Sequence, residues 1–375
     1  MEKEKFSLKD HLFNPEKIHM LSDSIMEVYS DFEFMEFAHD IILRLPELEL
    51  KERIEYIARC LKRYLPKDYE EAIGIILESL PPELDPSKAD DDFWNFIYAP
   101  YWEFVVMKGL NEKYLRLSLD TLWELTKRFS VEWPIRYFLN EFETETFEQM
   151  KLWSKSDHYH LRRLASEGTR ASLPWGIKIN LDYKKPIEIL DDLYYDSTRF
   201  VTRSVANHMN DISKKDAVLV LDTLKRWKDS KKQNTKEMDF IISHSLRTLV
   251  KDGNKEALNF LWYTHPDITV DEFSILNPHI KMWEYLEFEF DITSNKAQNL
   301  MVDYVIHFVK ANGKLSGKTF KISKKKFGKW EVFKIMKKQM FREMTTRKFY
   351  AWEHFVELQI NGETFGKKAF ILHID

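Results

Sequence analysis

The sequence predicts two domains, an all-α solenoid of helical repeats over residues 1–281 and a small all-β sandwich over residues 282–375. Three observations lead to this fold class. Up to about residue 281, apolar residues recur at the spacing of one helix face. Several of these segments align with one another at an offset of 40 or 41 residues, which indicates stacked repeats. Beyond residue 281, apolar and polar residues alternate, as they do in half-buried strands.

The N-terminal part of the chain is predicted to form consecutive antiparallel helices. Asn14 followed by Pro15 is typical of a helix N-cap and a first helical residue. The segment LKERIEYIARCLKRYL places its apolar residues on one face, and DYEEAIGIILESL and NEKYLRLSLDTLWELTKRF show the same period. The connections are short and contain Pro, Asn or Asp, which favours a helical array over alternating strands and helices.

The stretch DDDFWNFIYAPYWEFV, residues 90–105, is unusually aromatic. Aromatic stripes are more often interior than ligand-binding, so we interpret most of these rings as core and inter-helix packing. One or two tyrosines near Pro100 remain candidates for a ligand surface. The rings expected in the core are Phe93, Phe96, Tyr98, Tyr101 and Trp102.

Another helix is predicted to begin around Val131. Ser130 is a suitable N-cap residue, and Pro134 is acceptable in the first turn of a helix. Glu132 would then lie at a helix start, where the helix dipole favours its ionised form.

Two runs about forty residues apart lie at the centre of the predicted solenoid, HYHLRRLASEGTRASLPW (158–175) and RFVTRSVANHMND (199–211). Both are predicted to be helices with an apolar back and a polar front. A third segment, KEMDFIISHSLRTLVKDG, aligns with the second at an offset of 41. This spacing matches HEAT-like repeats, which present one polar stripe per repeat to a partner. The polar fronts consist of Arg163, Glu167 and Arg170 in the first run, and Arg203, Asn207 and Asp211 in the second.

The C-terminal part is predicted to be an immunoglobulin-like sandwich. In EYLEFEFDI the apolar residues alternate with acidic ones, and NLMVDYVIHFVK, KWEVFKI and HFVELQI are further candidate strands. Asn312-Gly313 and Asn361-Gly362 are dipeptides typical of hairpin turns. Roughly six or seven short strands in this space fit a small sandwich of that type.

Composition and charge exclude several classes of protein. Cys60 is the only cysteine, which excludes an internal disulfide framework and a multi-cysteine metal site. No apolar run is long enough for a membrane span and the start has no secretory segment, so we expect a soluble cytoplasmic protein. The net charge is −4, but residues 310–348 hold 14 Lys/Arg against 2 Asp/Glu. A polyanion would therefore meet a locally basic surface.

The polar surface of the helical repeats contains carboxylates among arginines. Glu132, Glu167 and Asp211 are the candidates for chemistry, and Trp175 is an accompanying aromatic residue. Taken by themselves, these residues favour a network of structural ion pairs, because such networks are common, and a tryptophan after a proline more often packs than binds a ligand.

Four motifs in this order resemble the bacterial family of HEAT-like DNA alkylation repair glycosylases, specifically its AlkC branch: FIYAPYWEF, TKRFSVEWPIRYFL, RRLASEGTRASLPWG and RFVTRSVANHMNDISK. The opening segments SLKDHLFNPEKI and LKERIEYIARCLKRYLPKDYEEA, and the tail segments DYVIHFVKANGK and MTTRKFY, resemble the same branch. The family usually has proline and arginine at Ala171 and Ser172, and phenylalanine and alanine at Trp133 and Pro134. The absence of that arginine is expected to weaken one phosphate contact.

The resemblance implies a monofunctional glycosylase that removes small cationic N-methylated bases, such as 3-methyladenine, 3-methylcytosine and 1-methyladenine, from duplex DNA. It implies no metal and no cofactor, no deep base-flipping pocket, and a monomer that works on DNA in the bacterial cytoplasm at the nucleoid. Glu132 and Asp211 are expected to flank the deoxyribose, Glu167 to select adducts, and Trp175 to lie against the sugar-phosphate or the base. A cationic base leaves without a general acid, so carboxylates need only stabilise the sugar cation and direct a water.

The residues expected to contact DNA come from both domains. In the repeats the arginines are expected to bind phosphates, and in the β domain the basic stretch 310–348 is expected to supply a second surface. A non-catalytic HEAT-repeat scaffold that binds nucleic acid or protein is the alternative, because a fold does not determine a function. The expected DNA contacts are Arg163, Arg170, Arg203, Asn207, Arg247, Lys310, Lys314, Arg347 and Lys348.

Overall fold

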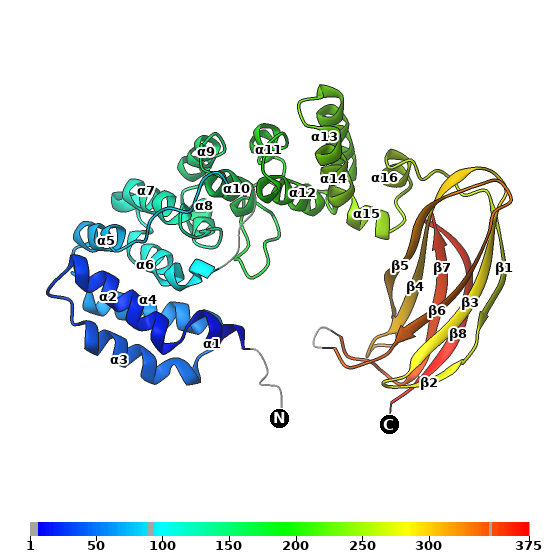
Figure 1. Ribbon diagram of the computed structural model, residues 1–375, viewed down its shortest axis with the longest axis horizontal. Helices are drawn as coiled ribbons and strands as arrows, with labels where there is room; N and C mark the ends of the chain where they lie inside the picture. The colour runs from blue at the N-terminus through cyan, green and yellow to red at the C-terminus, as the bar shows by residue number, and fades with distance from the viewer. Residues whose placement is uncertain (1–6, 89–93, 345–346, 375) are drawn as a thin grey trace. The chain divides into compact units, whose positions relative to one another are not determined.

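A computed structural model of the chain describes residues 7–88, 94–344 and 347–374. The chain divides into two compact units, residues 1–216 with 222–245, and residues 217–221 with 246–375. In the described part of the chain, no helix is both long and apolar enough to cross a membrane. Figure 1 labels the helices and strands in chain order.

The first unit is an array of helices, as predicted, and its core is built from the apolar faces that the sequence indicates. In α4, for example, Ile54, Ile57, Ala58 and Leu61 are all buried. The helices of this unit follow one another in chain order (Figure 1). They are α1 (Leu8–Leu12), α2 (Pro15–Val28), α3 (Phe34–Arg44), α4 (Leu50–Tyr64), α5 (Tyr69–Glu78), α6 (Ala99–Gly109), α7 (Leu115–Thr126), α8 (Ile135–Glu141), α9 (Glu143–Trp153), α10 (Tyr159–Gly168), α11 (Ile187–Leu193), α12 (Arg199–Ser213), most of α13 (Ala217–Ser230) and α14 (Thr235–Ser245), with 3-10 turns η1 (Leu45–Glu47), η2 (Trp94–Tyr98) and η3 (Glu112–Tyr114).

Several N-terminal predictions are confirmed. Asn14 is the N-cap of α2 and accepts a hydrogen bond from the Lys17 backbone N–H, with Pro15 as the first helical residue. The aromatic stretch is interior, because Phe96, Tyr98, Tyr101 and Trp102 are all buried. Neither tyrosine near Pro100 is therefore on the surface. Phe93 lies outside the described residues.

The stacked repeats predicted from the two central runs are present, since α10 packs against α12 and α12 against α14. The first run does not stay helical to its end. Helix α10 stops at Gly168, which packs tightly against Ile135 and Met150. The Thr169 hydroxyl donates a hydrogen bond to the Ala165 carbonyl at 2.8 Å. Residues 170–175 are therefore a loop, in which Arg170 lies beyond the helix.

Two further helix predictions are wrong in their bounds. The helix expected from Val131 begins at Ile135, with Pro134 as its N-cap, because the Ser130 hydroxyl bonds to the Glu132 carboxylate instead of capping the backbone. Glu132 therefore lies in a turn before the helix. The segment 236–253 is two helices rather than one, α14 ending at Ser245 and α15 (Arg247–Lys251) beginning after Leu246.

The second unit contains a sandwich of two sheets. One sheet has the order β1-β3-β6 and the other β2-β8-β7-β4-β5, with the buried face of each supplying the core. In β3, Leu286, Phe288, Phe290 and Ile292 are buried, as the alternation predicts. The elements are α15, α16 (Lys255–Phe260), β1 (Ile268–Ile275), β2 (His279–Lys281), β3 (Tyr285–Ser294), β4 (Gln298–Val309), β5 (Leu315–Phe327), β6 (Val332–Met340), β7 (Trp352–Ile360) and β8 (Glu363–His373).

The two predicted hairpins are present. Asn361 and Gly362 both have positive φ, 44° and 79°, and join β7 to β8, while Gly313, at φ 73°, lies in the turn between β4 and β5. The boundary predicted at residues 281/282 falls too late, because β1 and β2 already precede it. The alternation is weaker there, since no residue of β1 is buried and the strand pairs only with β3 within its sheet.

Candidate functional site

The candidate site is built on the loop 169–177, which one buried arginine holds in place. Arg136 of α8 is 1% exposed and donates from Nε to the Ile177 carbonyl at 2.6 Å, and from Nη1 to the Gly168 and Arg170 carbonyls at 3.1 and 2.7 Å. Three carbonyls in and beside the loop are thereby fixed to one guanidinium. The loop carries Arg170 and Trp175, so its shape decides where both side chains lie.

Arg170 joins two of the predicted carboxylates. Its Nη1 donates to Glu167 Oε1 at 2.5 Å, and its Nε and Nη2 donate to Asp211 Oδ2 at 2.9 and 2.8 Å. All three residues are buried. Glu167 comes from the end of α10 and Asp211 from the last turns of α12, so the loop arginine ties two repeats together.

Both oxygens of Glu167 are occupied. Ser204 of α12 donates to Oε2 at 2.5 Å, opposite the arginine on Oε1. Burial acts to raise the pKa of Glu167, but Arg163, Arg170 and the Ser204 hydroxyl outweigh it and hold that pKa below its usual range. Glu167 is therefore an ionised carboxylate with a protein donor on each oxygen.

Glu132 differs from the other two carboxylates because it is more accessible. Arg163 Nη1 donates to its Oε2 at 2.6 Å, and the Ser130 hydroxyl donates to the same oxygen at 2.7 Å. Among the described residues, Oε1 has no hydrogen-bond partner, and the side chain is 18% exposed. Glu132 therefore presents one free carboxylate oxygen.

The three carboxylates form one electrostatic cluster. Burial and the neighbouring Arg170 lower the pKa of Arg136 to about 10, while Glu167, Glu132 and Asp211 act in the opposite direction on the same guanidinium. The Arg136 guanidinium thus interacts electrostatically with Glu132, Glu167 and Asp211. The network of structural ion pairs that these residues favour in the sequence is also present, because each carboxylate is ion-paired with an arginine.

Trp175 is held in an uncommon conformation. Its φ is 65°, in the left-handed region that large side chains rarely adopt, and its side chain is 60% exposed. Lys51 Nζ donates to its carbonyl at 2.5 Å, and its ring lies 6.0 Å from that of Trp133. The backbone contact and the ring contact leave the indole directed toward solvent rather than buried in the core.

The predicted phosphate-binding residues of the repeats have different environments. Arg163 and Arg170 are engaged in the ion pairs just described, and Arg170 is buried, which corrects its predicted role as a surface phosphate contact. Arg203 is exposed on α12. Asn207 Oδ1 lies 2.8 Å from His244 Nε2, and Arg247 is the first residue of α15, in the second unit.

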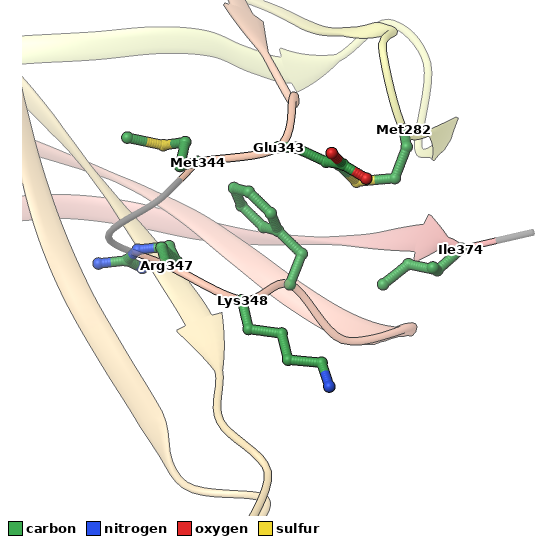
Figure 2. Close-up of a pocket in the computed structure, with 7 residues that line it drawn as sticks. Met282, Glu343, Met344, Arg347, Lys348 and Ile374 are labelled. Atoms are coloured by element: carbon green, nitrogen blue, oxygen red, sulfur yellow. The ribbon is translucent and has the colours of Figure 1, made fainter. Parts of the chain in front are cut away.

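The predicted basic residues of the β domain lie close together. Lys310 and Lys314 face each other across the β4–β5 turn, with the Lys310 N–H bonded to the Lys314 carbonyl at 2.9 Å. Lys310, Arg347 and Lys348 line one cavity of about 490 Å³. Figure 2 shows the neighbouring cavity of about 580 Å³, in which Arg347 and Lys348 project from the segment after β6.

Sequence reasoning missed several residues of the site. Arg136 was overlooked because it follows an apolar helical pattern, yet a charged residue on the buried face of α8 was the available signal. His208 lies in the same region, where burial and Arg170 lower its pKa to about 4, so it is neutral near pH 7. Ser204 gave no recognisable pattern, and Ser130 was predicted as an N-cap rather than as a partner of Glu132. No group of three or more potential metal ligands occurs among the described residues.

Comparisons with known proteins agree with this architecture. A family model for the C-terminal Ig-like domain of the uncharacterised protein YhaZ matches residues 269–374. The uncharacterized protein YhaZ of Bacillus subtilis strain 168 is 33% identical over 357 residues, 94% of this chain and 96% of its own length. The structure of the Pseudomonas fluorescens alkylpurine DNA glycosylase AlkC, bound to DNA containing an abasic site analog, matches with a TM-score of 0.86 at 30% identity, over 98% of this chain and 100% of that chain. The chain therefore belongs to the AlkC branch of the HEAT-like DNA glycosylase family, with the C-terminal immunoglobulin-like domain.

Proposed function

We propose that this protein is a monofunctional DNA glycosylase that hydrolyses the N-glycosidic bond of alkylated purines and related small cationic N-methylated bases in duplex DNA. The supporting observation is the single cluster of Glu132, Glu167 and Asp211 within a chain similar over its whole length to an alkylpurine DNA glycosylase. The proposed substrates are 3-methyladenine, 3-methylcytosine and 1-methyladenine. The proposed working form is a monomer in the bacterial cytoplasm that needs no cofactor.

In the proposed reaction, Glu132 positions the attacking water. Its Oε1 is the carboxylate oxygen of the cluster without a protein partner among the described residues, and a water there would be held for attack at C1′. Arg163 fixes the other oxygen, so the carboxylate keeps one orientation. Removing a water-positioning group of this kind typically costs a factor of about 10² to 10⁴ in rate.

Asp211 and Glu167 would act through their charge. Both carboxylates are buried, where water screens charge poorly, and their oxygens would favour the sugar cation that forms as the base leaves. Lys214 donates to Asp211 Oδ1 at 3.1 Å and is 46% exposed. A DNA phosphate offers this ammonium another partner, which would leave Asp211 Oδ1 free toward the sugar.

The leaving group needs little help. A base methylated at a ring nitrogen already carries the positive charge that a general acid would otherwise supply, so bond cleavage returns it as a neutral molecule. The exposed indole of Trp175 would lie against the sugar or the cationic base and provide a cation–π surface. DNA would be held by Arg203 in the repeats and by the basic cluster of the β domain.

One observation favours a second function, a scaffold that binds nucleic acid without cutting it. Glu167 and Asp211 are buried and fully ion-paired, as expected of a structural network. Incubation with methylated duplex DNA followed by hot alkali separates the two. Strand scission at the lesion with the parent chain, and its disappearance in Asp211→Asn, supports the glycosylase. Retarded mobility of the DNA without scission by the parent chain supports the scaffold.

A further inference from the structure

A small cavity opens beside Trp175, and none of the three ion-paired carboxylates lines it. Its volume is about 100 Å³, against roughly 30 Å³ per water molecule in the liquid, so it has room for about three waters or for the edge of one heterocyclic ring. It is formed by α4, α6, the start of α8 and the loop after α10. Its lining residues are Lys51, Ile54, Glu55, Trp102, Glu103, Trp133, Tyr137, Trp175, Gly176 and Ile177.

Three tryptophans form the aromatic wall of this cavity. Trp102 and Trp133 meet edge to face with centroids 5.7 Å apart, and Trp133 and Trp175 lie 6.0 Å apart at 46°. Rings set at angles to one another present more than one π face to the same space. Such an arrangement is the one by which proteins recognise methylated cations.

A partly buried carboxylate faces the same space. Glu103 of α6 is partly buried, and it forms no hydrogen bond or ion pair with the other described residues. Burial raises its pKa above the usual range, and the nearby Glu55 raises it further, while Arg59 compensates only in part. Negative charge at this position is therefore under-compensated by the protein, and a bound cation would stabilise it.

Two further observations support a polar, cationic occupant. Trp102 is buried, and its indole N–H has no acceptor within the described part of the chain. This buried donor has no partner there, and Trp102 lines the cavity. The Trp133 ring also takes a cation on its face, because Lys51 Nζ lies 5.2 Å from the ring centroid; a bound base would replace this ammonium there.

We propose that this cavity binds the charged edge of an N-methylated nucleobase, with Glu103 as counter-ion and the Trp133 and Trp175 rings as the cation–π surface. The proposal rests on the proposed function and names how that site selects its substrate. The cavity is small, so we propose that the lesion is read at its edge. A neutral, unmethylated base lacks the positive charge that Glu103 would stabilise, which makes the cavity selective for the damaged form.

The test measures binding and excision separately on the full chain. Intrinsic tryptophan fluorescence is titrated with 1-methyladenosine, which is cationic at neutral pH, and with adenosine as the matched neutral probe. The parent chain is expected to prefer the cation about tenfold, and Glu103→Gln to abolish that preference. Trp133→Phe keeps an aromatic ring and is expected to reduce the preference in part. Glu112→Gln, an exposed residue of η3, is the control with the same charge change and is expected to match the parent.

Equal binding of the two nucleosides by the parent, or an undiminished preference in Glu103→Gln, would overturn the proposal. Excision from methylated duplex keeps this failure distinct from failure of the proposed function. A parent chain that releases no base refutes the proposed function. A parent that releases base while Glu103→Gln releases it at the same rate refutes only the cavity. The far-ultraviolet spectrum and thermal midpoint of each variant verify that it is folded.

Discussion

Arg163 and Glu132 form a 2.6 Å ion pair that occupies only one oxygen of the carboxylate. The arginine also lies over the ring of Phe200, with Cζ 4.7 Å from the centroid, so it is fixed from a second side. Its partner keeps Oε1 free among the described residues, whereas Glu167 has both oxygens engaged. This asymmetry, together with the greater exposure of Glu132, makes Glu132 the better placed of the two carboxylates to position a water.

Glu132→Gln is expected to lower the excision rate about 10²- to 10⁴-fold because an amide positions a water but does not accept its proton. DNA affinity should change little, since the residue is not a phosphate contact. Single-turnover release of base from methylated duplex measures the rate, and mobility shift measures affinity. Glu141→Gln, at an exposed residue at the end of α8, the helix that follows Glu132, is the control and should retain the parental rate. A parental rate in Glu132→Gln would assign the water to another group.

Arg170→Met is expected to destabilise the fold by about 3–5 kcal/mol because it leaves Glu167 and Asp211 buried without their common partner. Arg203→Met, at an exposed residue of α12, should destabilise the fold less than Arg170→Met and weaken DNA binding. Urea denaturation and mobility shift measure the two effects. Equal stability of the two variants would contradict a structural role for Arg170 and support its role as a phosphate contact.

Acidification is expected to destabilise the helical unit through His208. Burial lowers its folded-state pKa to about 4, so below the unfolded value of about 6.5 the unfolded chain binds the proton first. The stability that this group contributes is fully present above pH 6.5 and is lost as the pH falls toward 4, by about 2 kcal/mol at pH 5. Urea midpoints at pH 7 and pH 5 measure the decrease. In His208→Gln the difference between the two pH values should shrink by that amount; an unchanged difference would show that another group titrates.

The basic cluster of the β domain is expected to control the salt dependence of DNA binding. Replacing Lys310, Lys314 and Lys348 by alanine should reduce the slope of log affinity against log salt by about 0.9 for each phosphate that the variant no longer neutralises. Fluorescence anisotropy of a labelled duplex at several salt concentrations measures the slope. A triple variant of exposed lysines in the helical unit changes the net charge equally; a slope reduced as much there would show that only overall charge matters. The three lysines replaced in this control variant are Lys62, Lys67 and Lys88.

Part of this protein was determined by local sequence. The apolar spacing of α4, α10 and α12, the alternation in β3 and the Asn361-Gly362 turn each follow from nearest-neighbour geometry, so periodicity predicted them. The repeat offset then brought Glu167 and Asp211 onto adjacent helices. The prediction that the carboxylates lie among arginines needed no more than this.

Tertiary structure decided which of these side chains are available. The sequence does not show that Arg136 reaches three carbonyls in and beside one loop, that Arg170 turns inward between two carboxylates, or that Lys51, 124 residues from Trp175, holds its carbonyl. These contacts join distant parts of the chain, and burial gives each charge a partner because an unpaired ion is costly away from water. Periodicity reports which face a residue occupies, whereas packing alone determines which oxygen of Glu132 is left for a substrate.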